Sequence, residues 1–315
     1  MRFFSALTLL AVAAIGAGCS STASTEASCR TGAECASGVC LASGTCEPLQ
    51  NAGDGGLTPG DGSAPIVNGD SGACVPNGDG RIDRNEFPAS PGLRATYAYA
   101  SAVAVNFAGV TANGVTTWDF KGPYASDTTR VVDVQATAGK WWAGAFTGAS
   151  YALALGSTSD LLGVFVLNDT GLTLRGVVSP ADGTTKTQLA YDPGASFLRF
   201  PMRKGDAWST TSTITGTVQG LTIASTSGTQ YTETYAITVD AEGFVEVPFG
   251  RFKVLRVLTT LTRKNQFGQP ISTMPNKKTV AFVAECFGTV ASATSNDNEA
   301  TPLFSTAAEL QRLAP

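Results

Sequence analysis

The sequence predicts a mainly β protein, with one antiparallel sandwich or curved half-barrel after a disordered, disulfide-containing N-terminal region. Charged residues make up only 15% of the chain, and Gly, Ser, Thr and Ala are abundant, which is typical of β-rich exported domains. From about residue 88 onward, large apolar residues alternate with small or polar ones, which is the period of a strand. Turns that contain Gly, Asn or Asp separate these alternating runs.

The predicted strands begin with the alternating run 97–107. Residues 161–167 and 172–178 then form a hairpin, because the intervening sequence Asn-Asp-Thr-Gly is a typical turn. A second hairpin is expected between residues 235–239 and 244–247, across Asp-Ala-Glu-Gly.

The C-terminal part continues this pattern. The strand 252–262 follows a turn at 248–250, and the runs 279–283 and 287–291 add one or two late strands. Residues 306–313 are expected to be helical, because Thr306 and Glu309 have the spacing of a capping box.

The first 18 residues have the layout of an export signal. Arg2 precedes an apolar run, 3–15, that is shorter than the roughly 20 residues of a membrane-spanning helix. Small residues then lead to Cys19. This ending resembles the lipobox of bacterial lipoproteins, although Gly16 stands where that pattern usually has leucine. The resemblance implies a lipid on Cys19, and the alternative is plain export.

A lipobox implies a cell-envelope location with the membrane as a partner. In lipoproteins, an aspartate directly after the lipidated cysteine resembles an inner-membrane retention signal. Ser20 stands at this position instead, which favours the outer membrane. Loss of Arg2 with the signal changes the net charge from −4 to about −5, and no basic stripe remains. Nucleic acid is therefore not an expected partner.

The seven cysteines divide into three groups. Cys19 is the proposed lipid site, and Cys74 and Cys286 are expected to form a long-range disulfide, because exported chains meet an oxidising compartment. The other four cysteines lie close together: Cys29, Cys35, Cys40 and Cys46. They are expected to form disulfides in one of three pairings, since the C-x2-C spacing that metal knuckles favour is absent.

These signals divide the chain into successive parts. The segment 29–46 resembles the short Cys-rich repeats near the start of bacterial surface lipoproteins. The resemblance implies either an adhesion module or a spacer. The expected order is signal peptide 1–18, tether 19–28, Cys-rich module 29–46, flexible linker 47–73, calcium-loop-like segment 74–87 and β domain 88–315.

The calcium-loop-like segment contains NGDGRIDRNEF at residues 77–87, which resembles an EF-hand or dockerin-type loop. The first ligand position, normally aspartate, falls on Val75, and no helix precedes the loop. The alternative is an ordinary Gly-rich turn. If calcium is the cofactor, the resemblance implies as ligands Asn77, Asp79, the carbonyl of Arg81, Asp83 and Glu86.

A second resemblance lies in the C-terminal half. The segments 247–254 (VPFGRFKV) and 287–290 (FGTV) resemble a turn-and-strand pattern of exported β domains. The resemblance implies a half-barrel related to periplasmic lipoprotein carriers, in which Gly250 supplies a turn and Phe252 and Val254 supply core. These motifs are structural and imply no activity.

Candidate catalytic groups are few. The chain has no histidine, which excludes Ser-His-Asp and Cys-His catalysis and the usual His-containing zinc sites. The plausible acids and bases are the carboxylates within or beside predicted strands: Asp133, Glu233, Asp240, Glu242, Glu246 and Glu285. Trp141, Trp142 and Trp208 could form a sugar-stacking platform, but aromatic residues at this spacing are more often core.

The sequence favours a non-enzymatic, lipid-anchored envelope protein whose β domain binds a hydrophobic ligand, a glycan or another protein. A calcium-supported carbohydrate-binding protein and a carboxylate-based hydrolase are the alternatives. An apolar groove would favour the first function, an exposed tryptophan beside a polar cleft the second, and two carboxylates in one pocket the third.

Overall fold

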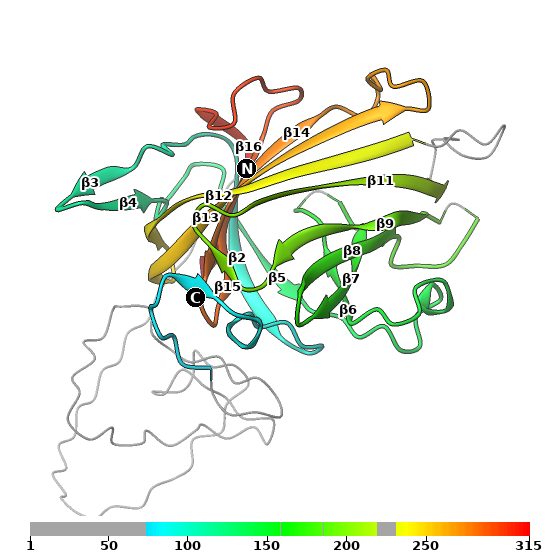
Figure 1. Ribbon diagram of the computed structural model, residues 1–315, viewed down its shortest axis with the longest axis horizontal. Coiled ribbons are helices and arrows are strands. Elements are labelled where there is room, and N and C mark those ends of the chain that lie inside the picture. The colour runs from blue at the N-terminus through cyan, green and yellow to red at the C-terminus, as the bar shows by residue number, and fades with distance from the viewer. Residues whose placement is uncertain (1–73, 158, 185, 219–230) are drawn as a thin grey trace, which may run out of the picture. The chain divides into compact units, whose positions relative to one another are not determined.

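A computed structural model describes residues 74–157, 159–184, 186–218 and 231–315 (Figure 1). The sequence predictions for residues 1–73 lie outside this part of the chain. They concern the signal peptide, the lipid on Cys19, the tether, the linker and the four clustered cysteines Cys29, Cys35, Cys40 and Cys46.

The described chain is almost entirely strand and turn. Two short 3-10 helices interrupt it, η2 (Arg84–Glu86) and η3 (Ala143–Ala145). The strands are β1 (Arg81–Ile82), β2 (Arg94–Ala104), β3 (Val110–Ala112), β4 (Val115–Asp119), β5 (Thr128–Asp133), β6 (Tyr151–Ala154), β7 (Leu162–Asn168), β8 (Gly171–Val178), β9 (Gln188–Arg199), β10 (Met202–Arg203), β11 (Ala207–Thr217), β12 (Tyr231–Val247), β13 (Gly250–Asn265), β14 (Lys277–Ala284), β15 (Gly288–Ser295) and β16 (Thr306–Ala314).

One large sheet contains all but two of these strands, and it curls into a nearly closed barrel. Its order is β5-β2-β16-β15-β14-β13-β12-β11-β9-β8-β7-β6, and β3 and β4 branch from β12. The end strands β5 and β6 meet through a single bridge between Gln135 and Ala152, whose two N–H···O bonds are both 2.9 Å long. The predicted antiparallel, curved β architecture is confirmed, and closure removes most of the open edge.

The hairpin predicted at 161–178 is confirmed, since β7 and β8 pair across its turn. The hairpin predicted across residues 240–243 is wrong. Strand β12 runs through this segment without reversing. A bulge between Val239 and Ala241 accommodates Asp240, and residues 241–243 pair in register with β13. A bulge carries one extra residue while the partner strand continues, so turn-forming residues need not make a turn.

The helix predicted at 306–313 is also wrong. This segment is β16, which lies between β2 and β15 near one end of the sheet order. Leu310 and Arg312 are buried on one face and alternate with the half-buried Glu309 and Gln311. Pairing with two neighbouring strands outweighs the small intrinsic helix preference of this segment.

Two hydrophobic cores lie on opposite faces of β13. Leu255 and Val257 face the first core, which also contains residues of β7, β8, β9 and β11 and therefore fills the barrel interior. Phe252 and Val254 face the second core, together with Trp118 of β4. The alternation of a strand explains why neighbouring residues serve different cores.

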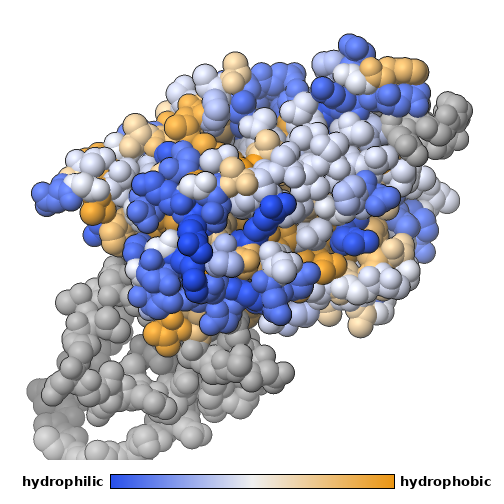
Figure 2. All heavy atoms as spheres, in the orientation of Figure 1, coloured by the Kyte–Doolittle hydropathy of each residue, from blue (hydrophilic) through white to orange (hydrophobic). Residues whose placement is uncertain are grey.

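The outer face of the barrel over β11 and β12 is of intermediate hydropathy in Figure 2. Ser209, Thr211 and Thr215 of β11 are exposed, while Trp208 and Ile214 of the same strand are buried. Threonine satisfies the strand preference for β-branched residues without adding charge, which is consistent with the low charged fraction of the chain.

Candidate functional site

The segment 74–93 is fastened to the barrel at several points. Cys74 and Cys286 form the predicted disulfide, with a Cα–Cα distance of 5.6 Å. Strand β1 pairs with β10, and the side chains of Ile82 and Phe87 are buried in the interior core. The long-range crosslink predicted from the cysteine count is therefore present, and it holds a segment too short to fold alone.

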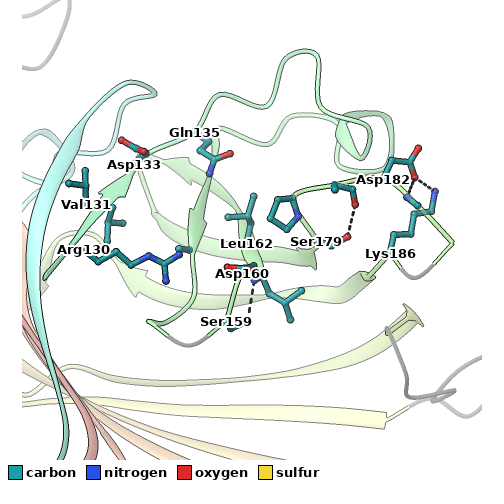
Figure 3. A pocket seen from close by; sticks show the side chains of 16 residues that line it. Arg130, Val131, Asp133, Gln135, Ser159, Asp160, Leu162, Ser179, Asp182 and Lys186 are labelled. Atoms are coloured by element: carbon teal, nitrogen blue, oxygen red, sulfur yellow. Dashed lines mark hydrogen bonds and ion pairs between the residues drawn. The ribbon is translucent and has the colours of Figure 1, made fainter. Parts of the chain in front are cut away.

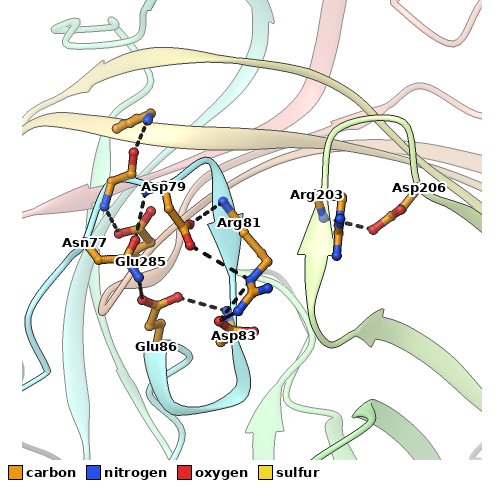
Figure 4. A network of polar contacts seen from close by, with 10 residues as sticks. Asn77, Asp79, Arg81, Asp83, Glu86, Arg203, Asp206 and Glu285 are labelled. Carbon is orange, nitrogen blue, oxygen red and sulfur yellow. Dashed lines mark hydrogen bonds and ion pairs between the residues drawn. The ribbon is translucent and has the colours of Figure 1, made fainter.

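The calcium-loop-like segment closes on itself through hydrogen bonds (Figure 4). The side-chain amide of Asn77 donates to Glu86 Oε1 at 2.8 Å, and Asn77 Oδ1 accepts from the backbone N–H of Asp79 at 2.8 Å. The guanidinium of Arg81 donates to the Asp83 carboxylate. Glu86 Oε2 accepts from the backbone N–H of Asp83 at 2.9 Å, as in a capping box.

These contacts engage the oxygens that the sequence assigned to calcium. Within residues 74–157, 159–184, 186–218 and 231–315, no group of three or more His, Cys, Asp or Glu side chains is arranged to hold a metal ion. The Arg81 guanidinium supplies the positive charge beside Asp79 and Asp83, while burial raises the pKa of Glu86. Calcium binding stays a prediction, and it would require the Arg81 side chain to move.

The six candidate catalytic carboxylates are distributed over the molecule. Asp133 pairs with Arg94, Asp240 with Arg256 and Glu246 with Lys121. Glu285 accepts a 2.8 Å hydrogen bond from the backbone N–H of Gly78. Glu242 and Glu285 both line a pocket of about 10 Å³, which holds no more than one water-sized molecule. This arrangement provides no space for a glycoside between two acids.

Glu233 is the most buried of these carboxylates, with 1% exposure. Its Oε2 accepts hydrogen bonds from Tyr191 at 2.9 Å and Tyr235 at 2.6 Å, and its Oε1 accepts from Arg263 Nε at 2.7 Å. A buried carboxylate with a cation and two hydroxyl donors is fully paired. Its place is therefore explained by packing.

The three candidate tryptophans do not form a platform. Trp142 is buried in a small core beside Phe146, and Trp208 is buried in the barrel interior. Trp141 is half-buried, with its Nε1 bonded to the Ser179 carbonyl at 3.1 Å and Lys186 Nζ 4.6 Å from the centre of its ring. Trp141 and Trp142 do not lie in a strand but directly before η3, so the two side chains do not point to opposite faces of a sheet.

An apolar cavity of about 340 Å³ lies beside the closure of the barrel. Its walls come from the segment 87–93 and from β2, β5, β6, β15 and β16. The apolar and aromatic side chains that define it are Phe87, Leu93, Tyr97, Tyr99, Val132, Tyr151 and Leu153. Its volume falls within the ~300–1,000 Å³ of ligand sites, and its composition favours an apolar ligand.

The tyrosines of this apolar cavity are neutral. Tyr97 donates its hydroxyl to the Thr289 carbonyl at 2.9 Å. Burial raises the pKa of Tyr97 and of Tyr151, and burial together with the nearby Glu309 raises the pKa of Tyr99 to about 12. The phenol walls therefore carry no charge near neutral pH, which suits a hydrocarbon ligand.

A second, polar cavity of about 700 Å³ lies next to the first (Figure 3). Residues of β5, β6 and β7, of the loop before β7 and of the loop between β8 and β9 line it. Val132 and Ala154 line both cavities, so the two spaces adjoin where β5 and β6 separate. We call this place the seam of the barrel.

The two cavities were not apparent from the sequence. The alternation at Tyr97 and Tyr99 predicts a strand, but its partners across the seam lie in β6, far along the chain. No local signal marks Val132, Tyr151 or Leu153 as ligand-facing, because a cavity wall and a core have the same apolar pattern.

Comparisons with known proteins do not identify the chain. No family model and no curated protein matches it. One similar solved structure is a Bacteroides fragilis protein described as exported with a YmcC-like fold, at 11% identity and a TM-score of 0.26, covering 72% of this chain and 96% of that one. A TM-score this low supports no conclusion about the present chain.

The described residues also contain no helix that is long and apolar enough to span a membrane.

Proposed function

We propose that this chain is a non-enzymatic, lipid-anchored protein of the cell envelope whose barrel binds a hydrophobic ligand. The apolar cavity at the seam carries this proposal, because it combines a volume of about 340 Å³ with neutral aromatic walls. The Cys74–Cys286 disulfide supports an oxidising compartment, and the lipobox-like ending at Cys19 supports an anchor.

A ligand has a defined way into the apolar cavity. On one side the wall is the segment 87–93, which is held by a disulfide and a few backbone bonds, including Gly92 N–H to the Val134 carbonyl at 2.8 Å. On the other side, β5 and β6 share only the Gln135–Ala152 bridge. Parts of a fold with few hydrogen bonds open at low free-energy cost, so the seam is the expected entrance.

Titration of the purified protein with the neutral apolar dye N-phenyl-1-naphthylamine tests the cavity. We expect saturable fluorescence enhancement and competition by dodecanol. Leu153→Trp fills the cavity and should weaken dye binding about tenfold, or ~1.4 kcal/mol.

The matched control is Leu155→Trp, because Leu155 lies two residues further along, is 44% exposed and does not line the cavity. It should leave the dye affinity within about twofold of wild type. Unsaturable dye binding, or equal effects of the two substitutions, contradicts a ligand site in the cavity.

Mass spectrometry of the mature protein tests the anchor. A chain that begins at Cys19 with a diacylglyceryl group is expected, and a Cys19→Ser chain should remain unlipidated. An unmodified Cys19, or cleavage elsewhere, contradicts the lipoprotein assignment without affecting the dye experiment.

A further inference from the structure

The adjoining cavities suggest what kind of hydrophobic ligand the barrel takes. The apolar and polar cavities share Val132 and Ala154 at the seam. A molecule whose hydrocarbon part fills the apolar cavity would place a polar end in the polar cavity by passing Val132 and Ala154 at the seam. This step rests on the proposed function, because it assigns the head group of the same ligand.

Some of the charged side chains that line the polar cavity are in ion pairs, and others are not. Asp182 pairs with Lys186 at 2.8 Å, and Asp133 pairs with Arg94. Arg130 and Asp160 remain, and neither is in an ion pair within the described part of the chain.

The side chain of Arg130 is held at the seam by hydrogen bonds to two backbone carbonyls. It lies directly across from Tyr97 in the β2–β5 register, so both side chains are on the same face of the sheet. Its Nη1 donates to the carbonyls of Gly156 at 3.0 Å and Ser157 at 2.9 Å. These bonds fix the guanidinium beside the apolar cavity. Arg130 forms no ion pair with a described carboxylate, and the nearby Glu309 carboxylate is bonded to Ser157 instead.

Asp160 supplies the opposite charge from the loop before β7. It is exposed, and its carboxylate makes no hydrogen bond or ion pair with the described residues. In Figure 3, Arg130 and Asp160 approach the same space from two sides. The cavity thus offers a ligand one positive group, which is held by hydrogen bonds, and one negative group on an exposed loop.

We infer that the barrel binds a single-chain amphiphile with a zwitterionic head group. The anionic centre of the head pairs with Arg130 through charge-assisted hydrogen bonds, and the cationic centre pairs with Asp160. The volume of about 340 Å³ lies near the lower limit of ligand sites, which favours one hydrocarbon chain over two. An anion or a cation alone would satisfy one side chain and face the like charge of the other.

Isothermal titration with four dodecyl amphiphiles, each below its micelle concentration, tests the inference. The probes are dodecylphosphocholine (zwitterionic), dodecanoate (anionic), dodecyltrimethylammonium (cationic) and dodecyl maltoside (neutral). We expect dodecylphosphocholine to bind about tenfold more tightly than dodecanoate or dodecyltrimethylammonium.

Substitutions then assign the head-group contacts. Asp160→Lys should make dodecanoate the tightest of the three charged ligands, and Arg130→Gln should remove the advantage of dodecylphosphocholine. Maltoside affinity should stay within about twofold in both variants. Asp169→Lys is the matched control, because Asp169 is exposed in the β7–β8 turn and does not line the polar cavity. It should change no affinity.

The outcomes separate the two proposals. Equal, saturable binding of all four amphiphiles, or an unchanged preference in Asp160→Lys, overturns the zwitterion assignment and leaves the apolar site standing. Failure of every amphiphile to bind overturns both the apolar site and the head-group assignment.

Discussion

At the scale of single residues, the buried charged side chains of the described chain are held by ion pairs or hydrogen bonds. Arg256 bonds to Asp240 and to the Phe107 carbonyl, and Arg312 bonds to Asp127. Glu233 is bonded to two tyrosines and Arg263. Arg130 and Asp160 differ from these groups, because they line the polar cavity and form no ion pair with the described residues.

Removing the Glu233 carboxylate should strongly destabilise the barrel. Glu233→Ala leaves the charge of Arg263 unpaired and two buried hydroxyls without an acceptor, so we expect the free energy of unfolding to fall by about 3 kcal/mol. Chemical denaturation measures this change.

A surface pair provides the control for Glu233. Asp182→Ala breaks the exposed Asp182–Lys186 pair and should leave the free energy of unfolding almost unchanged, because solvent screens an exposed ion pair. If the two substitutions destabilise the protein equally, the interior network contributes no more than a surface salt bridge.

At the scale of elements, the segment 74–93 is the part that depends most on a crosslink. It contains only the two-residue strand β1 and the short helix η2, and it covers one wall of the apolar cavity. The disulfide joins positions 212 residues apart. The disulfide closes a long loop and so lowers the conformational entropy of the unfolded chain. This effect is the main stabilisation of the folded position of the segment.

Replacing both cysteines should lower stability without changing the sheet. In the chain-entropy model, Cys74→Ser with Cys286→Ser reduces the free energy of unfolding by about 5 kcal/mol, because the closed loop is long. Hydrogen exchange should accelerate first and most strongly in residues 74–93, and in β12 to β14 only by the loss of global stability. Uniform acceleration across the barrel would contradict a local role of the disulfide.

Calcium binding by the segment 77–87 is expected to be weak. The ion would have to displace the Arg81 side chain from Asp79 and Asp83, so a dissociation constant of about 1 mM is the tightest value we expect. Titration calorimetry should show heat for wild type and none for Asp79→Ala. Absence of heat in wild type would show that this loop does not bind calcium.

At the scale of the whole molecule, the barrel buries nearly all of its phenols. The chain has seven tyrosines, and burial is the first cause of a raised pKa in every one of them: Tyr97, Tyr99, Tyr124, Tyr151, Tyr191, Tyr231 and Tyr235. The native state therefore keeps protons that the unfolded chain releases near pH ~10.

This difference predicts alkaline unfolding with a definite sign. Because the folded pKa values are raised, the stabilising difference is complete below pH ~10 and is lost as the pH rises above it. Phenolate absorbance should increase together with the loss of the β-sheet circular dichroism signal. Phenolate absorbance that increases near pH ~10 while the barrel stays folded would show that the phenols are accessible to solvent.

Local sequence predicted the strands of the barrel better than their connections. Alternation located β2, and turn chemistry located the β7–β8 hairpin, because both depend on neighbouring residues. Residues 240–243 have turn chemistry but lie inside β12, and residues 306–313 have a helix-capping pattern but form β16. In both cases pairing with distant strands outweighed the local preference.

The candidate site was predicted least well for the same reason. The sequence left an apolar groove, a polar cleft with tryptophan and a carboxylate pair as alternatives, and it identified none of the residues that line the apolar cavity as a site. Tyr97 and Leu153 become neighbours of one cavity only when β2, β5 and β6 come together at the seam. Conversely, the calcium ligands chosen by spacing are bonded to one another and to Arg81.

The sequence by itself determined the β class of this protein, the absence of histidine chemistry and the Cys74–Cys286 crosslink. These follow from composition, strand period and the number of cysteines, which are properties that need no knowledge of contacts. Only the tertiary structure decided where the barrel closes, and the closure creates both cavities. The physical reason is that strand pairing is a long-range interaction: the free energy that selects the partner of β5 or β6 comes from residues far away in the chain.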